Sequence, residues 1–194
     1  MIPENDPGEG ASGIWMESYL WVRNCNSPEK LKGMKLTFIQ TGGTIDKDYP
    51  RTTKGYAFEI AEPAVERILE KLNPAFEYEV IPALKKDSLD ITEEDRLSIL
   101  EICKGADSER IIITHGTDTM LETARVLSQL KDKTIIITGA MRPERFTNSD
   151  APVTVGMAIG AVNVLGKGVY IAMHGRIISW DRCKRDMKTG QYTD

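Results

Sequence analysis

Two threonine-rich turns carry the residues of this chain that could do chemistry. The first turn is Thr41-Gly42-Gly43-Thr44-Ile45, and the second is His115-Gly116-Thr117-Asp118-Thr119-Met120. Each turn follows directly after a run typical of a buried β-strand, at 35–40 and at 110–114. Because open parallel sheets build their ligand sites at the carboxyl ends of strands, we expect both clusters of hydroxyls at one rim. Two threonines and a carboxylate at that rim indicate a hydrolase with a hydroxyl nucleophile.

Thr44 and Thr117 are the candidate catalytic hydroxyls. A threonine hydroxyl must lose its proton to a neighbouring base as it attacks, so a titratable partner has to lie within hydrogen-bond reach, and Asp118 is a candidate for that supporting role. Gly43 and Gly116 let backbone amides approach a ligand closely, and a helix expected after Thr117 would point its N–H groups at an anion or oxyanion. The alternative is that each threonine only caps a turn or helix. Two such turns with the same polarity and placement favour the catalytic interpretation.

Four segments of the chain form a recognisable set. They are TGGTI at 41–45, DSLDIT at 87–92, ITHGTDTM at 113–120 and TGAMRP at 138–143. In this order they resemble the threonine-dependent L-asparaginases of the asparaginase/glutaminase family, and the resemblance extends from Met34 to about Gly175. It implies hydrolysis of the side-chain amide of L-asparagine to L-aspartate and ammonia through a covalent acyl-threonine intermediate. It also implies that no metal and no organic cofactor take part.

The resemblance gives a role to each matched residue of the two turns. Thr44 looks like the nucleophile that is acylated by the β-carboxamide carbon of the substrate. Tyr56 would be its partner, because it lies in a glycine- and threonine-containing segment that suits a mobile flap. Tyr49 competes for that role, and a solvent-exposed aromatic ring is the alternative for both tyrosines. Thr117 resembles the second catalytic threonine, bonded to the attacking water or to the leaving amide, and Asp118 would bind the α-ammonium group of the substrate.

The substrate-binding residues implied by the resemblance lie on four different segments. They are Gly43, Asp87, Ser88, Gly116 and Ala140. Ser88, together with backbone amides, would bind the α-carboxylate of the substrate, and the carbonyl of Ala140 would receive the amide nitrogen. Asp87 and Ser88 can also be read as the cap region of the helix that follows, with Thr92 as the better cap. Both interpretations can hold at once.

The chain departs from the family pattern in three respects. Family members carry a lysine that completes a Thr-Lys-Asp set, and Lys167 is the lysine nearest to the position expected for it; the alternative is a solvated loop lysine. Leu89 replaces a polar residue found beside the binding serine in many relatives. Typical relatives also have a second, smaller C-terminal domain. We expect that domain to be absent here, with residues 34–194 forming a single asparaginase-like catalytic domain.

Alternating strand and helix patterns predict an α/β protein. Strands are expected at 35–40, 76–82, 110–114, 133–138 and 168–173, and helices at 62–72, 92–104, 117–130 and 151–165. Strands separated by helices imply right-handed crossovers and a mainly parallel sheet with helices on both faces, a Rossmann-like three-layer sandwich. Residues 1–33 are rich in Gly, Pro, Asn, Ser and acidic residues, and we expect them to form a disordered or weakly docked leader.

Composition narrows the range of partners. The 194 residues are 41% hydrophobic and 28% charged, which is ordinary for a globular protein. A formal net charge of −4 argues against nucleic acid or an anionic membrane surface as a partner, and no apolar run in the sequence is long enough to span a bilayer. A basic stretch near the end is interpreted as solvated or as part of a subunit contact. It consists of Arg182, Lys184, Arg185 and Lys188.

Cysteine and histidine usage indicates the compartment and disfavours metal chemistry. Cys25, Cys103 and Cys183 are widely spaced, which disfavours a disulfide framework and favours a reducing cytoplasm. Neither His115 nor His174 has a Cys or His at the spacing of zinc ligands, so no metal is expected, and His115 is expected to orient its turn. Family members assemble as dimers or tetramers, so the resemblance implies a homo-oligomer that binds a small-molecule amide.

Several alternatives remain open at the level of the sequence. L-glutamine or another small amide is an alternative substrate, because Leu89 and the missing domain change the part of the pocket that contacts the amino-acid backbone. A catalytically silent amino-acid-binding protein is a second alternative. A subunit that feeds ammonia to a tRNA-linked partner is a third, against which the acidic charge weighs. Direct attack by a water that Thr117 orients is the rival to the acyl-threonine mechanism.

Overall fold

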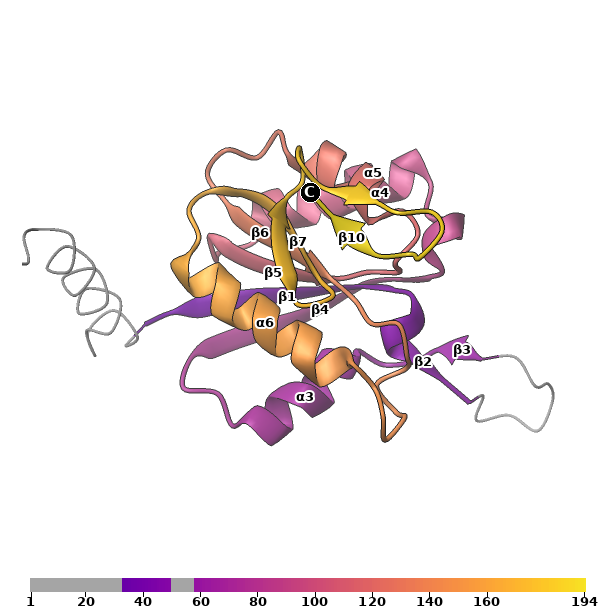
Figure 1. Ribbon diagram of the computed structural model, residues 1–194. Coiled ribbons are helices and arrows are strands. Elements are labelled where there is room, and N and C mark those ends of the chain that lie inside the picture. The colour runs from indigo at the N-terminus through magenta and orange to yellow at the C-terminus, as the bar shows by residue number, and fades with distance from the viewer. Residues whose placement is uncertain (1–32, 50–57) are drawn as a thin grey trace, which may run out of the picture. The chain divides into compact units, whose positions relative to one another are not determined.

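A six-stranded sheet forms the centre of residues Lys35–Asp194 in the computed structural model (Figure 1). The structure describes residues 33–49 and 58–194. The strand order is β4-β1-β5-β6-β7-β8. The strands are β1 (Lys35–Gly42), β4 (Glu77–Lys86), β5 (Arg110–Thr114), β6 (Thr134–Thr138), β7 (Gly168–Met173) and β8 (Arg176–Ser179). The first five pair in parallel and β8 runs antiparallel to β7, so the predicted mainly parallel α/β sheet is confirmed.

Helices cover both faces of this sheet. On one face, α6 (Ala151–Val164) packs on β5, β6 and β7, and α3 (Ala64–Leu72) packs beside α6. On the other face lie α4 (Glu93–Gly105), which contacts β4, and α5 (Met120–Leu127), which contacts β7 and α4. Figure 1 shows α3 and α6 together on one side of the strands and α4 and α5 together on the other. The domain therefore has the three layers that the alternating sequence pattern predicts.

The two central strands explain why both faces must be covered. β5 and β6 each carry three consecutive isoleucines, and all six side chains are fully buried. Because successive side chains of a strand point to opposite faces, such a run needs an apolar layer on each side. Ile111 and Ile113 pack in the cluster that includes residues of α4 and α5, while Ile112, between them, faces the side of α6.

The structure tests the predicted first residues of two helices, α4 and α5. Thr92 caps α4 through a reciprocal pair of hydrogen bonds: its Oγ1 accepts from the Asp95 amide at 3.2 Å, and the Asp95 carboxylate accepts from the Thr92 amide at 2.8 Å. The prediction of Thr92 as the cap is confirmed. The prediction that α5 starts at Thr117 is wrong, because α5 begins at Met120. Contacts with Ser88 hold the intervening turn: Thr119 Oγ1 donates to the Ser88 carbonyl at 2.7 Å.

Three short antiparallel elements were not predicted. They are β8, the pair β9 (Lys184–Arg185) and β10 (Tyr192–Thr193), and the pair β2 (Lys47–Asp48) and β3 (Glu59–Ile60). The last two pairs have only two residues in each strand, too few to show an alternating pattern. His174 and Gly175 join β7 to β8 with φ of 54° and 76°, the two positive values that a tight hairpin turn requires.

Two sequence predictions concern residues outside the described part of the chain. The expected leader, apart from Gly33, falls on residues that the structure does not describe, and so does the expected flap residue Tyr56. Within residues 33–49 and 58–194, no helix combines the length and the apolar character needed to cross a bilayer.

Candidate active site

The two threonine turns meet backbone to backbone at the carboxyl ends of β1 and β5. A Cβ added at Gly43 would lie 2.3 Å from the Gly116 Cα and 2.4 Å from the Gly116 nitrogen. A Cβ added at Gly116 would lie 2.7 Å from both the Cβ and the Oγ of Ser88. Only glycine fits at either position, and Gly43 also has a φ of +83°, which side chains disfavour. Thr44 and Thr117, each next to one of these glycines, therefore belong to one cluster.

The parallel sheet explains why these residues come together. Thr44 follows β1, Ser88 follows β4 and Thr117 follows β5, and these three strands are neighbours. Parallel strands present their carboxyl ends at the same edge, where ligand sites of such sheets form. Thr44 begins a short 3-10 helix, Thr44–Asp46, and is partly exposed, whereas Thr117 is 8% exposed. The site thus contains one partly exposed threonine and one nearly buried threonine.

Ser88 links the segment after β4 to the second turn. Its side chain is fully buried, and its Oγ accepts a hydrogen bond from the Asp118 amide at 3.2 Å. Asp87 caps the 3-10 helix Ser88–Asp90 by accepting from the Leu89 amide at 3.3 Å. The Lys47 ammonium, 2.9 Å from the Asp87 carboxylate, holds the pKa of that carboxyl below its usual range. Asp87 thus caps this short helix and not α4, whose cap is Thr92, while the contacts of Ser88 are compatible with a place in the site.

His115 is a neutral support for the second turn. It is fully buried, and burial lowers the pKa of its imidazole to about 4. Its Nδ1 lies 2.7 Å from the Gly116 carbonyl and its Nε2 lies 2.8 Å from Thr123 Oγ1. Since a carbonyl can only accept, Nδ1 carries the proton and Nε2 accepts from the Thr123 hydroxyl. These bonds agree with the prediction that His115 orients the turn, and they leave it without a free basic nitrogen.

Ala140 lies on the adjoining strand end, after β6. A Cβ at the preceding Gly139 would lie 2.4 Å from the His115 carbonyl oxygen, so the two loops are in backbone contact. Asp150 holds the loop that follows by accepting from the Met141 amide at 2.9 Å and from the Arg142 amide at 3.0 Å. Ala140 itself is 1% exposed. The loop after β6, which contains Ala140, is therefore fixed next to the second threonine turn.

Lys167 does not belong to this site, and the prediction that it completes the Thr-Lys-Asp set is wrong. Lys167 precedes β7, at the amino ends of the strands, and forms an ion pair with Glu109, which precedes β5. Thr117 follows the opposite end of β5. At a rise of about 3.3 Å per residue, a five-residue strand separates the two ends by roughly 16 Å. The lysine therefore faces the opposite edge of the sheet.

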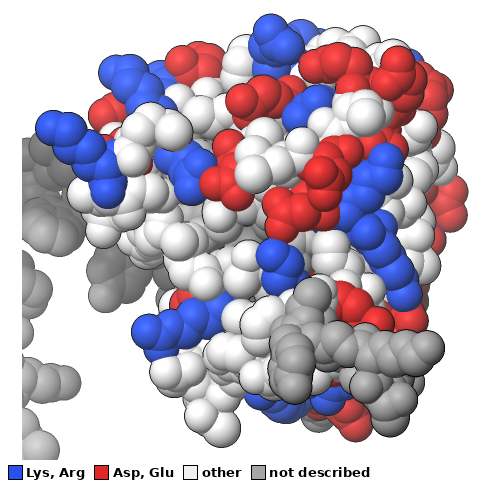
Figure 2. All heavy atoms as spheres, turned by 90° about the vertical axis from the view of Figure 1, so that its right-hand side faces the viewer, with Lys and Arg blue, Asp and Glu red and all other residues white. Residues whose placement is uncertain are grey.

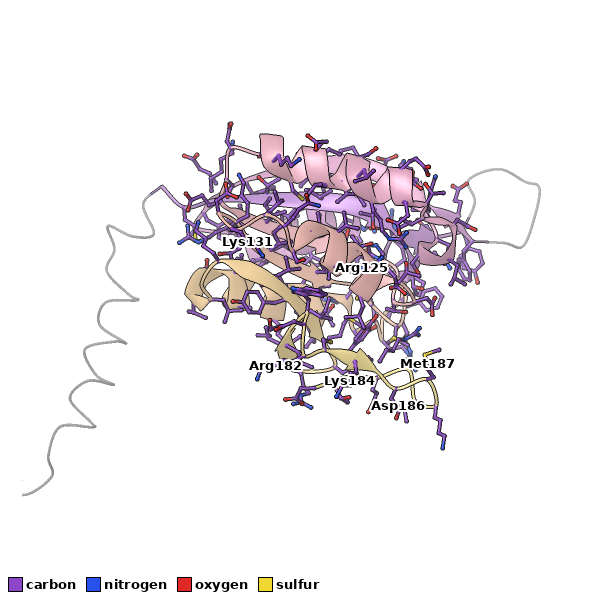
Figure 3. The ribbon with its side chains drawn as sticks, turned by 90° about the horizontal axis from the view of Figure 1, so that it is seen from above. Arg125, Lys131, Arg182, Lys184, Asp186 and Met187 are labelled. Atoms are coloured by element: carbon purple, nitrogen blue, oxygen red, sulfur yellow. The ribbon has the colours of Figure 1, made fainter. Side chains whose placement is uncertain are left out.

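The cation beside Asp118 is instead Arg185. Its Nη1 donates to Asp118 Oδ1 at 2.8 Å, and its side chain is 17% exposed. The β9–β10 hairpin positions it: Arg185 pairs with Tyr192, whose hydroxyl donates to the Thr117 carbonyl at 2.6 Å. The interpretation of Arg185 as a solvated residue is therefore wrong, and the alternative of a subunit contact stays a prediction. Arg182, which precedes β9, and Lys184 are exposed (Figure 3). No local pattern distinguishes the half-buried Arg185 from its exposed neighbours, so sequence reasoning missed it.

The described end of the flap contains an aromatic group. The Tyr49 ring lies 4.9 Å from the Phe58 ring, and the Phe58 ring lies 6.0 Å from that of Phe146. Tyr49 is 65% exposed, and its ring contacts Phe58. Leu89, beside Ser88, is also exposed, at 72%. The tyrosine partner expected for Thr44 thus remains a prediction that concerns Tyr56.

Charges of both signs occur on the face that Figure 2 presents, where acidic and basic side chains are interspersed. Within the described residues, no group of three or more His, Cys, Asp or Glu is arranged to hold a metal ion. The depression lined by Leu121, Arg125 and Trp180, of about 460 Å³, includes neither threonine. The candidate chemistry is therefore that of the hydroxyls, the carboxylate and the guanidinium at the carboxyl ends of β1, β4 and β5.

Fold and site together define an α/β protein with paired threonine turns at the rim of a parallel sheet. Comparison with known proteins identifies the family: residues 35–191 match the family described as "Asparaginase, N-terminal", and the chain belongs to it. A glutaminase-asparaginase of Acinetobacter glutaminasificans is 29% identical over 156 residues, which cover 74% of this chain and 47% of that protein. The L-asparaginase 2-3 of Saccharomyces cerevisiae is 34% identical over 152 residues, covering 72% and 41%.

A solved structure agrees with these matches. The thermostable L-asparaginase from Thermococcus kodakarensis superposes with a TM-score of 0.69 at 30% identity, covering 78% of this chain and 48% of that one. The chain spans less than half the length of each of these relatives. The family is thus established for residues 35–191, and the fold agrees with that of a solved L-asparaginase.

Proposed function

We propose that this domain hydrolyses the side-chain amide of L-asparagine to give L-aspartate and ammonia. The observation that carries the proposal is the contact between Gly43 and Gly116, which brings Thr44 and Thr117 into one cluster. Membership of the asparaginase family supports the reaction class. The chemistry needs two hydroxyl-bearing residues at one place, and the parallel sheet supplies them from two neighbouring strands.

In the proposed first half-reaction, the Thr44 hydroxyl oxygen attacks the carboxamide carbon of the substrate. The hydroxyl proton passes to a neighbouring base, for which Tyr56 remains the candidate, and the C–N bond breaks as the leaving nitrogen takes up a proton and departs as ammonia. An ester on Thr44 is left. Thr44 suits this role because it is the more exposed of the two threonines and starts the 3-10 helix after β1.

In the second half-reaction, a water oriented by Thr117 attacks the ester carbon, the ester bond to Thr44 breaks and the Thr44 oxygen regains a proton. Asp118 and Arg185 support this step. The Arg185 guanidinium donates a hydrogen bond to the Asp118 carboxylate at 2.8 Å and so fixes the orientation of that carboxylate. In this proposal Arg185 orients the carboxylate and does not take part in proton transfer.

Recognition of the substrate's amino-acid part is assigned to Ser88 and Asp118. The Ser88 oxygen already accepts from the Asp118 amide, so its hydroxyl hydrogen is available for a carboxylate acceptor. One Asp118 oxygen accepts from Arg185, and the carboxylate, 39% exposed, can still face an ammonium group. The Ala140 carbonyl would receive the amide nitrogen, as the family resemblance implies.

The direct test is the release of ammonia from L-asparagine and, in parallel, from L-glutamine by the full chain. Thr44→Val should reduce turnover by at least about a thousandfold, since removing a nucleophile removes the covalent route. Thr147→Val is the matched control and should retain activity, because Thr147 is an exposed residue of the loop between β6 and α6, seven positions beyond Ala140. A Thr44→Val enzyme with near-normal turnover would exclude the proposal. Release from glutamine but not asparagine would revise the substrate.

A second experiment distinguishes the covalent route from direct attack by water. Acid quenching during turnover, followed by proteolysis and mass spectrometry, should show an aspartyl ester on the peptide that contains Thr44. Hydrolysis in ¹⁸O-labelled water gives one labelled oxygen by either route, so it serves only as a check of turnover. If no ester accumulates in wild type or in a Thr117→Val variant slowed in the second step, attack by a Thr117-oriented water is the better description.

A further inference from the structure

The peptide unit between Thr117 and Asp118 is held at both of its ends. Its carbonyl, on Thr117, accepts from the Tyr192 hydroxyl at 2.6 Å, and its N–H, on Asp118, donates to Ser88 Oγ at 3.2 Å. A peptide unit is planar, so its C=O and N–H turn together. Whatever fixes the carbonyl therefore also fixes the direction in which the amide meets Ser88.

Tyr192 is itself rigidly anchored. It is 1% exposed, and its strand β10 pairs with β9. Its amide donates to His174 Nδ1 at 3.3 Å, and its ring stacks on the His174 ring with a centroid separation of 6.2 Å. Burial raises the pKa of the Tyr192 phenol above its usual value, so the hydroxyl is a protonated donor at neutral pH. The donor to Thr117 is thus set by packing remote from the site.

The orientation of the Thr117–Asp118 peptide also affects the Ser88 hydroxyl. Ser88 is fully buried, its oxygen accepts from the Asp118 amide, and its carbonyl accepts from Thr119 Oγ1 at 2.7 Å. A hydroxyl that accepts along one direction must donate along another. The direction of the Ser88 hydroxyl hydrogen, and the position of Thr117 beside it, therefore depend on the same peptide plane.

We propose that Tyr192 is a positioning residue of the active site: its hydroxyl fixes the plane of the Thr117–Asp118 peptide and thereby directs the Ser88 hydroxyl toward the carboxylate of the bound amino acid. The part of the inference that concerns catalysis rests on the proposed amide hydrolysis. The part that concerns the peptide plane does not, and it is measured separately. Nothing in the motifs of the two threonine turns assigns a role to this tyrosine.

The test is Tyr192→Phe in the full chain, which keeps the ring and removes only the donor. We expect kcat/KM for L-asparagine to fall about tenfold, the loss typical of one hydrogen bond, mainly through a rise in KM because Ser88 is misdirected. Tyr170→Phe is the matched control, since the Tyr170 hydroxyl donates to the Gly166 carbonyl at 3.3 Å, toward the opposite edge of the sheet. It should stay within twofold of wild type. A Tyr192→Phe enzyme with unchanged kinetics overturns the proposal.

A double-mutant cycle separates positioning from general weakening. In a Ser88→Ala background the acceptor of the Asp118 amide is gone, so Tyr192→Phe should cost less than twofold there, against about tenfold in wild type. Independent, multiplicative effects would show that Tyr192 does not act through Ser88. All kinetics are measured well below the melting temperature of each variant, so that a lower stability alone does not change them.

An NMR measurement distinguishes failure of this inference from failure of the proposed function. The Asp118 amide resonance should shift, and its hydrogen exchange accelerate, in Tyr192→Phe but not in Tyr170→Phe. If wild type releases no ammonia but this pattern appears, the proposed function fails and the peptide-plane part of the inference stands. If Tyr192→Phe does not fold, 3-fluorotyrosine at position 192, a stronger donor in the same ring, should shift the Asp118 amide. Absence of any shift in that protein overturns the inference.

Discussion

Arg185 and Asp118, 67 positions apart in the sequence, form an ion pair of 2.8 Å beside the second catalytic threonine candidate. The pair is partly buried, with side-chain exposures of 17% for the arginine and 39% for the aspartate. The ion pair places an arginine beside Asp118, where the family resemblance implies a lysine. A guanidinium offers several donors in a fixed plane, so it constrains the carboxylate more than an ammonium does.

Removing this cation should impair turnover without unfolding the domain. For Arg185→Met we expect kcat/KM to fall roughly 10- to 100-fold, because a charged hydrogen bond contributes about 1.5–3 kcal/mol and the Asp118 carboxylate loses its partner. Lys184→Met, at the exposed neighbouring position, should retain activity within twofold. Steady-state ammonia release measures both variants. Equal activities in the two would show that the ion pair has no part in catalysis.

Lys167→Met should leave turnover unchanged. Its ion pair with Glu109 lies at the amino ends of the strands and is exposed, so we expect a stability change of no more than about 1 kcal/mol. Urea denaturation and ammonia release measure the two effects on one sample. A large loss of kcat in this variant, with normal stability, would contradict the placement of the site at the opposite edge.

Gly43→Ala should be strongly destabilising. A Cβ at this position would lie 2.3 Å from the Gly116 Cα, and the φ of +83° adds a backbone penalty, so we expect a loss of at least about 2 kcal/mol and of activity. Gly156→Ala is the matched control, because Gly156 is an exposed position inside α6 with nothing within 4 Å of an added Cβ. There the same change should stabilise the protein by about 0.5–1 kcal/mol. Chemical denaturation of both variants decides the comparison.

Asp46 should make stability depend on pH below neutrality. It is 1% exposed, its Oδ1 accepts from the Ala64 amide at 2.8 Å, and Oδ2 has no hydrogen-bond partner among the described residues. Burial raises the pKa of its carboxyl from 3.8 to about 7, against the opposing effects of the Ala64 amide, Gln40 and the cations of Arg67 and Lys85. The folded state therefore binds a proton that the unfolded state releases between pH 4 and pH 7.

The sign of the effect follows from this difference. The stabilising contribution of protonated Asp46 is fully present below pH 4 and is lost as pH rises to about 7, by at most about 4 kcal/mol. Asp46→Asn cannot titrate, and its amide can still accept from Ala64, so the stability of the variant should lack this slope. His115 has the opposite effect: because its pKa is lowered, it favours folding as pH rises from about 4 to about 6.5. This contribution is the same in wild type and in Asp46→Asn, so it cancels when the two proteins are compared. Urea denaturation of both at several pH values measures the difference; parallel curves would show that Asp46 has an ordinary pKa.

Local features of the sequence were sufficient for the five parallel strands of the sheet and for the meeting of the two threonine turns. Three consecutive isoleucines in β5 and in β6 specify strands buried on both faces, and Thr92 with Asp95 specifies the start of α4. Because parallel strands end at a common edge, two threonine turns that each follow such a strand were predicted to meet. The contact of Gly43 with Gly116 is that meeting point.

Tertiary structure alone decided which side chains support the two threonines. Arg185 and Tyr192 reach Asp118 and Thr117 across 67 and 75 positions of sequence, through a hairpin whose two-residue strands carry no periodic signal. Lys167, favoured by its position along the chain, lies at the wrong end of its strand. The start of α5 at Met120 likewise depends on bonds to Ser88, which no local propensity encodes. Hydrophobic periodicity and helix capping involve residues a few positions apart, so the sequence alone predicts strands and helix starts. The partner of a charged group or a hydroxyl depends on how distant segments pack, so only the tertiary structure shows it.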